Sequence, residues 1–178
     1  MRPRNNASSG YTIVEILDVV AIIGIMSLVT VPAFVNFQRA NTVKAGLRSF
    51  MSDVRNCRQR AISRNSQVRL ELDSSNTYRF YEKPYAGTWG ALNGFSGTGA
   101  GRNFKKLDSS LTFSANALGD SDSNSKNDMV FRPDGTADFG PGGSGSITML
   151  SNWKAIAQNQ YLIEISTSGK LKTTGSHS

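Results

Sequence analysis

An apolar stretch near the N-terminus restricts this chain more than any other part of the sequence. The chain opens with the polar, basic segment MRPRNNASSG and becomes apolar from Tyr11 onward, with residues 19–37 nearly free of polar side chains. A membrane-spanning helix needs about 20 mostly apolar residues, a length that the stretch reaches once its start, which carries two acids, is included. A buried core helix is the alternative, but such a helix is seldom apolar on all sides. We therefore expect a membrane-spanning helix.

Small residues stand before the apolar stretch, at Ser8, Ser9 and Gly10. In an ordinary secretory signal the small residues of the cleavage site follow the apolar stretch, so cleavage discards it. Cleavage after Gly10 would instead leave the apolar helix on the mature protein. The order of these features predicts a retained helix.

Residues 10–16, GYTIVEI, resemble the G-F-T-L-x-E-L motif of type IV prepilins and type II secretion pseudopilins, and AIIGI at 21–25 and Pro32 match the same family. The resemblance implies that a prepilin peptidase cuts between Gly10 and Tyr11 and methylates the new amine of Tyr11. It also implies a single-pass protein of the bacterial inner membrane with its globular domain on the periplasmic side. An inner-membrane assembly platform would then transfer the protein to a pilus or pseudopilus.

Two acids, Glu15 and Asp18, stand at the start of the apolar stretch. A charged side chain at the centre of a span costs about 2.5–3.5 kcal/mol on insertion scales, and less near the helix start. The resemblance implies that Glu15 pairs with the N-terminal amine of a neighbouring subunit during assembly. Asp18 lies on nearly the same helix face, where the family usually has an apolar residue. We interpret it either as a contact of a minor subunit with a particular neighbour or as an idiosyncrasy of this sequence.

Two positions weaken the apolar helix. Pro32 removes a backbone donor and favours a kink, and Gly24 lowers helix propensity. The resemblance implies that the segment between them can lose helicity inside the filament. Pro32 is therefore counted as an assembly position together with Glu15 and Asp18.

The following segment, residues 38–65, has no proline and a single glycine, Gly46. Apolar side chains recur there at steps of three and four, which predicts an amphipathic helix packed on the domain. The members of this stripe are Val43, Leu47, Phe50, Val54, Cys57 and Ala61. Basic residues border the stripe at Lys44, Arg48, Arg55 and Arg58. We interpret them as a solvated flank or as filament contacts, with anionic lipid or nucleic acid as the alternative partner.

After Asn65 the pattern changes to short runs typical of strands, separated by turn residues, and a glycine-rich run at 87–103 is expected to be an exposed loop. The expected strands lie at 68–72, 77–82, 111–114, 129–133, 136–139, 146–150, 161–166 and 170–173. A helix followed by antiparallel strands is an α+β arrangement. The predicted organisation is a leader peptide at 1–10, a transmembrane and filament-core helix at 11–37, its amphipathic half at 38–65, and a globular β-rich domain at 66–178.

Residues 56–72 resemble the A-R-x-x-A-I-x-R-x-x-x-V stretch of the GspH/FimT pseudopilin domain, and residues 129–139 and 162–173 resemble its C-terminal strands. This resemblance points to a minor rather than a major subunit. It implies that the partners are other pilin or pseudopilin subunits. The implied function is priming or tip assembly of a type IV pilus or a type II secretion pseudopilus.

DNA binding in uptake for natural transformation is the alternative function. The segment Gly169-Lys170-Leu171-Lys172 resembles the Gly-Arg-x-Arg motif of DNA-binding minor pilins of the FimT branch, but lysine lacks the bidentate fork of arginine. The candidate DNA-binding residues are Lys170, Lys172, Arg102, Lys105 and Lys106, provided that the fold brings them together. An ordinary hairpin with exposed lysines is the other interpretation. The balance of ten basic and ten acidic residues from Leu70 onward favours the hairpin.

Residues 120–128 place oxygen-bearing side chains at alternate positions, a pattern that suits a hard cation such as Ca²⁺. The candidate ligands are Asp120, Asp122, Asn124 and Asp128. The loop departs from the EF-hand pattern, because Ser125 replaces the glycine and Phe131 stands where a bidentate glutamate belongs. A polar loop without metal is the other interpretation, and no other cofactor is expected.

Catalysis is not expected from this sequence. The chain has one cysteine, Cys57, and one histidine, His177, and we find no paired carboxylates on a rigid element and no nucleophile motif. One cysteine and one distant histidine make neither a zinc site nor a basis for a nucleophile pair. The sequence therefore favours a structural protein over an enzyme.

Overall fold

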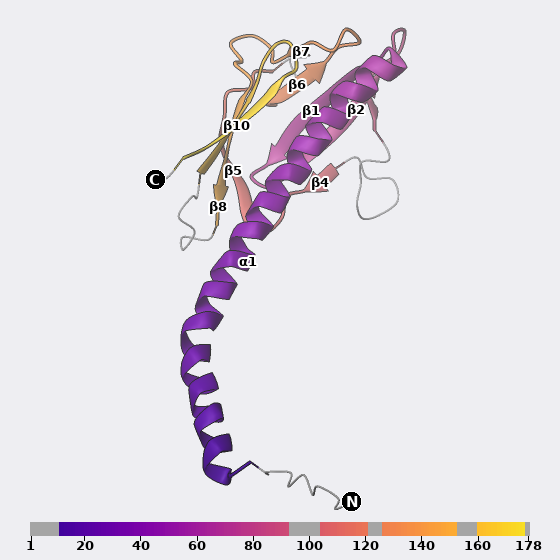
Figure 1. The fold of residues 1–178 in the computed structure, drawn as a ribbon. Coiled ribbons are helices and arrows are strands. Elements are labelled where there is room, and N and C mark those ends of the chain that lie inside the picture. The colour runs from indigo at the N-terminus through magenta and orange to yellow at the C-terminus, as the bar shows by residue number, and fades with distance from the viewer. Residues whose placement is uncertain (1–10, 93–103, 121–125, 153–159, 177–178) are drawn as a thin grey trace, which may run out of the picture. The chain divides into compact units, whose positions relative to one another are not determined.

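The computed structural model describes residues 11–92, 104–120, 126–152 and 160–176 (Figure 1). Its first element is the 52-residue helix α1, Ile13–Arg64. Contacts divide the chain into two compact units, one ending at Gln38 and the other beginning at Arg39. The second unit holds all the strands that the structure describes.

In the first unit, α1 begins behind a capping residue. The Glu15 amide donates a hydrogen bond to Thr12 Oγ1 at 3.2 Å, which satisfies one of the donors that a helix leaves open in its first turn. The large apolar side chains that follow are exposed, from Ile13 at 81% to Phe37 at 64%. The part of α1 that lies in the first unit is thus mostly apolar, and its described large apolar side chains are exposed.

Two hydroxyl groups within this apolar segment are satisfied by the helix itself. Ser27 Oγ donates to Ile23 O at 2.7 Å, and Thr30 Oγ1 donates to Met26 O at 2.9 Å. Bonds of this kind leave no unsatisfied hydroxyl donor on the helix surface, which matters wherever water is absent.

No single helix among the described residues is long and apolar enough to count as a membrane span by length and hydropathy. The segments Ile13–Leu28 and Ala33–Arg64, joined at a bend, pass the same test as a pair, on length and composition alone.

In the second unit, the predicted apolar stripe of α1 is buried, which confirms that expectation. Phe50, Val54 and Cys57 are fully buried, and the whole stripe belongs to the core. The single glycine of this half, Gly46, lets α1 pack closely against Leu111, because a Cβ at this position would lie 2.8 Å from Leu111 Cδ1. Periodicity at steps of three and four therefore identified the buried face correctly.

The helix ends at an asparagine in the left-handed region. Asn65 has a φ of 49°, and the Ser66 amide donates to Ala61 O at 3.1 Å, which closes the last turn. Asparagine tolerates this conformation better than most residues, so it serves here as a helix stop. Arg60 and Ser66 then both donate to the Glu82 carboxylate, which ties the end of the helix to a neighbouring strand.

Two antiparallel sheets pack with α1 (Figure 1). The six-stranded sheet has the order β3-β2-β1-β6-β7, and β4 also pairs with β2. Its strands are β1 Gln67–Ser74, β2 Thr77–Lys83, β3 Gly90–Ala91, β4 Phe104–Lys106, β6 Asp128–Phe131 and β7 Ala137–Asp138. The four-stranded sheet has the order β10-β9-β8-β5, with β5 Leu111–Asn116, β8 Ser146–Ser151, β9 Gln160–Ile165 and β10 Leu171–Ser176.

This architecture is the predicted α+β fold, and every expected strand overlaps an observed one. The two short strands β3 and β4 were not predicted. β3 lies inside the glycine-rich run that was expected to be a loop, which corrects that expectation for residues 90–91, whereas residues 93–103 lie outside the described part of the chain. A two-residue strand has no periodicity to detect, so only its partner β2 defines it.

The core contains one buried carboxylate beside aromatic rings. Phe50 and Tyr78 meet edge to face with ring centroids 5.1 Å apart. Asp53, on the same side of α1, accepts hydrogen bonds from Tyr78 Oη at 2.7 Å and from Lys105 Nζ at 2.8 Å. Burial, and after it the nearby Asp53 carboxylate, raises the pKa of Tyr78 well above its ordinary value, so its hydroxyl stays a donor. These bonds tie α1 to β2 and β4.

We predict that Tyr78→Phe lowers the free energy of unfolding by about 1.5–3 kcal/mol, because a buried charged acceptor loses a hydrogen bond. The matched control is Tyr85→Phe, whose side chain is 92% exposed and should change stability by less than about 0.5 kcal/mol. Urea titration of the chain in detergent micelles measures both values. Equal effects for the two variants would contradict the structural role of the Tyr78 hydroxyl.

Candidate functional site

The predicted processing and assembly residues lie around the start of α1. Gly10 lies outside the described residues, and Tyr11 directly precedes the helix with its side chain 81% exposed. Glu15 and Asp18 follow in the first turns, both exposed. Because positions three apart lie on nearly one helix face, the two carboxylates are available to the same neighbour.

The two positions predicted to weaken the helix both lie inside α1. The backbone is helical throughout residues 24–32. A Cβ at Gly24 would meet no atom within 4 Å, so no close contact requires this glycine in the isolated chain.

The predicted DNA-binding residues lie in different places. Lys105 and Lys106 belong to β4, where Lys105 Nζ reaches Ser49 Oγ at 3.3 Å as well as Asp53. Lys170 instead lies beside Arg58. Ser49 and Arg58 are about 180° apart around the helix axis, so Lys105 and Lys170 lie on opposite sides of α1. Arg102 lies outside the described residues. The fold therefore does not bring Lys105 together with Lys170.

Lys172 faces an acid across its own hairpin. It pairs with Glu164 in the β10–β9 register, and Lys172 Nζ lies 3.8 Å from Glu164 Oε2. Both side chains are well exposed, so the pair contributes little to stability. Of the two lysines in the predicted motif, only Lys170 has no acidic partner among the described residues.

Lys170 borders a hollow of about 420 Å³ on the flank of α1, which we call the basic groove. Its lining residues are Arg55, Arg58, Gln59 and Ile62 from α1, and Gly169, Lys170 and Leu171 from the turn into β10. Three of these side chains are cationic and none is acidic. The sequence placed Arg55 and Arg58 on the border of the apolar stripe, but it did not connect them with the C-terminal turn.

Gly169 makes the groove possible. Its φ is +72°, and a Cβ at this position would lie 2.6 Å from Arg58 Nε and 2.7 Å from Gly135 O. Arg58 Nε in turn donates to Gly135 O at 3.0 Å. The glycine of the predicted motif thus has a packing role, because only glycine fits both this backbone conformation and this close approach.

The calcium prediction falls partly outside the described residues, which include Asp120 and Asp128 but not Asp122 or Asn124. Asp128 is fully buried at the start of β6, with its Oδ2 atom 3.9 Å from Arg69 Nη1. Among the described residues, no group of three or more His, Cys, Asp or Glu side chains is placed to hold a metal ion. A carboxylate beside a buried arginine already has its counter-charge.

Arg69 is the centre of a buried charged cluster that sequence reasoning missed. Its guanidinium stacks over the rings of Tyr81 and Trp89, at 4.5 and 4.7 Å from their centroids. Glu71 and Asp128, both almost fully buried, supply the opposite charge at 3.8 and 3.9 Å. In strand β1, Arg69 and Glu71 alternate with core residues, so this cluster lies on the face of the sheet that is turned away from the core.

Lysine and arginine side chains extend the cluster outward. Lys126 Nζ lies 2.9 Å from Glu71 Oε1 and 3.4 Å from Asp73 Oδ1, and Arg79 Nη2 lies 2.9 Å from Asp73 Oδ2. The hydrogen bond from Arg79 lowers the pKa of Asp73, and the bond to Glu71 raises the pKa of Lys126. The mutual stabilisation of these charges holds β1, β2 and the segment before β6 together.

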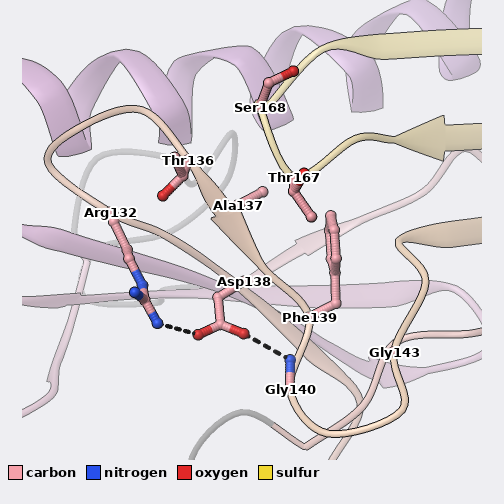
Figure 2. Close-up of a pocket in the computed structure, with 9 residues that line it drawn as sticks. All are labelled: Arg132, Thr136, Ala137, Asp138, Phe139, Gly140, Gly143, Thr167 and Ser168. Carbon is pink, nitrogen blue, oxygen red and sulfur yellow. Dashed lines mark hydrogen bonds and ion pairs between the residues drawn. The ribbon is translucent and has the colours of Figure 1, made fainter.

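A hollow of about 520 Å³ lies beside β7. Figure 2 shows the residues that line it, among them Arg132, Asp138, Phe139, Thr167 and Ser168. Asp138 accepts a hydrogen bond from the Gly140 amide at 3.0 Å and pairs with Arg132. The Gly140 amide, followed by the Arg132 guanidinium, keeps the pKa of Asp138 below its ordinary value. The charges at this hollow therefore neutralise each other, and its lining offers no nucleophile–base pair.

Cys57 offers no reactive thiol. It is fully buried in the stripe of α1, and burial raises its pKa well above the ordinary value. Because the thiolate is the reactive form, this residue acts as a small apolar side chain.

A long helix whose second half packs on antiparallel sheets, preceded by an exposed apolar half with an acid in its first turn, defines the type IV pilin-like class of subunits. Residues 47–169 match the model of the family described as type II transport protein GspH, and the chain belongs to this family. The family description places it among the type II transport proteins, as a pilin-like subunit. Membership implies contacts with other pilin subunits, and the subunits of this family are structural.

A solved structure of a pseudopilin agrees with this fold. The chain is similar to the minor pseudopilin EpsH from the type 2 secretion system of Vibrio cholerae, with 13% identity and a TM-score of 0.52 over 74% of this chain and 95% of that one. It also matches the type IV minor pilin FimU of Pseudomonas aeruginosa, with 12% identity and a TM-score of 0.45 over 76% and 98% of the two chains. No curated protein sequence matches it.

We predict that Arg69→Ala lowers the free energy of unfolding by about 3–5 kcal/mol, because two buried carboxylates lose their central counter-charge. Arg79→Ala is the matched control: its pair with Asp73 is partly exposed, and its loss should cost less than about 1 kcal/mol. Urea titrations of both variants in detergent micelles give the comparison. A cost for Arg69→Ala no larger than that for Arg79→Ala would show that the stacked cluster does not stabilise the sheet.

Proposed function

We propose that this chain is a structural minor subunit that takes part in priming or tip assembly of a type IV pilus or a type II secretion pseudopilus. A prepilin peptidase cuts it after Gly10 and methylates the amine of Tyr11. The apolar part of α1 holds it in the bacterial inner membrane, with the second unit on the periplasmic side. An inner-membrane assembly platform then transfers it to the filament.

The observation that carries this proposal is the exposure of the apolar half of α1. Between Ile13 and Phe37 the large apolar side chains described lie open, whereas the second unit has a closed core of its own. Exposed apolar area costs about 25 cal/mol per Å² in water, so a surface of this extent requires lipid or other apolar helices. Residues 19–37 cover about 28 Å as a helix, close to the hydrocarbon thickness of a bilayer at about 30 Å.

Glu15 supports a role for this helix in assembly. It is exposed in the first turn, and its amide rather than its carboxylate is used by the Thr12 cap. The carboxylate is therefore available to an N-terminal amine of a neighbouring helix. In a low-dielectric surrounding such a pair is strong enough to select the register of two helices that are otherwise uniformly apolar.

The DNA-uptake alternative has less support. Of its described candidate residues, Lys105 pairs with Asp53 and Lys172 pairs with Glu164, while Lys105 and Lys170 lie on opposite sides of α1. Nucleic-acid binding draws on several unpaired cations along one surface. The assembly role needs no such surface and uses the residues that the fold leaves exposed.

We predict that Glu15→Gln leaves cleavage and membrane location unchanged but reduces incorporation into filaments about tenfold or more, equivalent to about 1.4 kcal/mol. The reason is that glutamine keeps the shape of the side chain but loses the charge that pairs with the amine. Immunoblots of sheared or isolated filaments and of membrane fractions measure both quantities. Normal incorporation of Glu15→Gln would refute the pairing.

Asp18→Val is the companion variant. If Asp18 contacts a particular neighbouring subunit, this change also lowers incorporation and weakens cross-linking to that subunit. Unchanged assembly of Asp18→Val, with Glu15→Gln defective in the same experiment, would assign Asp18 to an idiosyncrasy of the sequence.

A further inference from the structure

We propose that the basic groove and the adjoining edge of β10 together bind an extended, acidic segment of another protein subunit, which adds to the sheet as a strand beside β10. This inference rests on the proposed function, because it takes the partner to be a neighbouring subunit. It adds a specific docking surface in the second unit, separate from the apolar helix.

The first observation is the open edge of the four-stranded sheet. β10 is its terminal strand and pairs only with β9 among the described residues, in a register without irregularity over residues 171–176. Within the described chain, the backbone of these residues makes no hydrogen bond beyond the β9 pairing. Natural edges are commonly blocked by proline, bulges or charged side chains, lysine above all. β10 contains no proline and no bulge, and its one charged side chain, Lys172, is paired with Glu164 on β9. An extended segment can therefore pair with it along its length.

The second observation is that the basic groove lies along this edge. Leu171 belongs both to β10 and to the groove, and Thr173 Oγ1 lies 3.0 Å from Met51 Sδ on α1. Met51 and Arg58 are separated by about 10 Å along the helix, and residues 170–173 cover about the same distance when extended. β10 thus follows the flank of α1, and a strand added at its edge would lie over that flank.

The charges in the groove define the partner. Arg55 and Lys170 are exposed and have no acidic partner among the described residues, and Arg58 is held in place by Gly135 O. The lining contains no acid, so carboxylates on an added strand would meet uncompensated positive charge. Between the cations lie Ile62, 44% exposed, and the half-buried Leu171, which offer contact to apolar side chains.

These features favour a protein segment over nucleic acid. Side chains of a strand alternate, so every second residue of the added segment would point toward α1, where acidic and apolar groups both find complementary contacts. A DNA duplex would form no strand pairing with the unpaired backbone N–H and C=O groups of β10. It would also meet a domain whose charge is balanced from Leu70 onward, with ten basic and ten acidic residues.

The test uses the full chain in detergent micelles and three probes: a peptide of about eight residues that alternates glutamate with valine or threonine, the same peptide with lysine in place of glutamate, and a short DNA duplex. Fluorescence anisotropy measures binding, and hydrogen exchange reports on the amides of β10. We expect the acidic peptide to bind in a salt-dependent manner and to slow exchange in β10, and the lysine peptide not to bind.

The variant Arg55→Glu/Lys170→Glu should weaken binding of the acidic peptide at least tenfold. Both side chains are exposed, so the fold should be retained, whereas Arg58 is left unchanged because it packs against the Gly169 turn. The matched control is Lys106→Glu, an exposed charge reversal on the other side of α1 that should leave binding unchanged.

Three results would overturn the inference: equal binding by the double variant, unchanged exchange in β10 with the acidic peptide bound, or binding of the duplex but not of the peptide, which would make this a nucleic-acid site. The assay requires neither cleavage nor filaments, so its failure leaves the proposed assembly role intact. Conversely, if the chain is not cleaved after Gly10 in cells, the measured binding of the acidic peptide remains valid.

Discussion

The large apolar side chains described in α1 between Ile13 and Phe37 are exposed, whereas the apolar stripe from Val43 to Ala61 is buried in the core. Burial of apolar surface is the main favourable term in folding, so the covered half stabilises the second unit. An exposed apolar half of this extent calls for an apolar surrounding. A single helix with two such halves connects a folded domain to a membrane or a filament, and the proposed function follows from that requirement.

Charge pairing inside the second unit determines which cations remain available. Asp53 engages Lys105 on the core side of the six-stranded sheet, and Arg69 is enclosed by two aromatic rings and two carboxylates on the other face. Buried charges persist only where partners compensate for lost hydration. Because the fold uses these groups internally, the net charge of the chain says little about its binding surface. Arg55 and Lys170, exposed together on one flank of α1 and without an acidic partner among the described residues, are cations that another molecule can reach.

The sequence predicted what depends on local periodicity. Steps of three and four identified the buried stripe of α1, and the runs of strand-forming residues located the longer strands. Asn65 was the last residue of the predicted helical segment, and it is also where the left-handed turn ends the helix. These features follow from side-chain direction in a regular element, which a single sequence encodes directly.

Contacts between distant segments were not predicted. The stacking of Trp89 on Arg69 and the pairing of Lys105 with Asp53 join positions 20 or more residues apart, and no local pattern reveals them. For the same reason the predicted group of basic residues was divided by the fold, with Lys105 and Lys170 on opposite sides of α1. Arg55 and Arg58 were predicted to border the apolar stripe, but only the structure shows that the Gly169 turn lies next to them.

The account depends on the apolar half of α1 remaining in the mature protein. Mass spectrometry of the chain isolated from membranes or filaments tests this most directly. The account predicts a mature chain that begins at Tyr11 with a methylated amine. A first residue beyond Pro32, with the apolar helix removed, would contradict it.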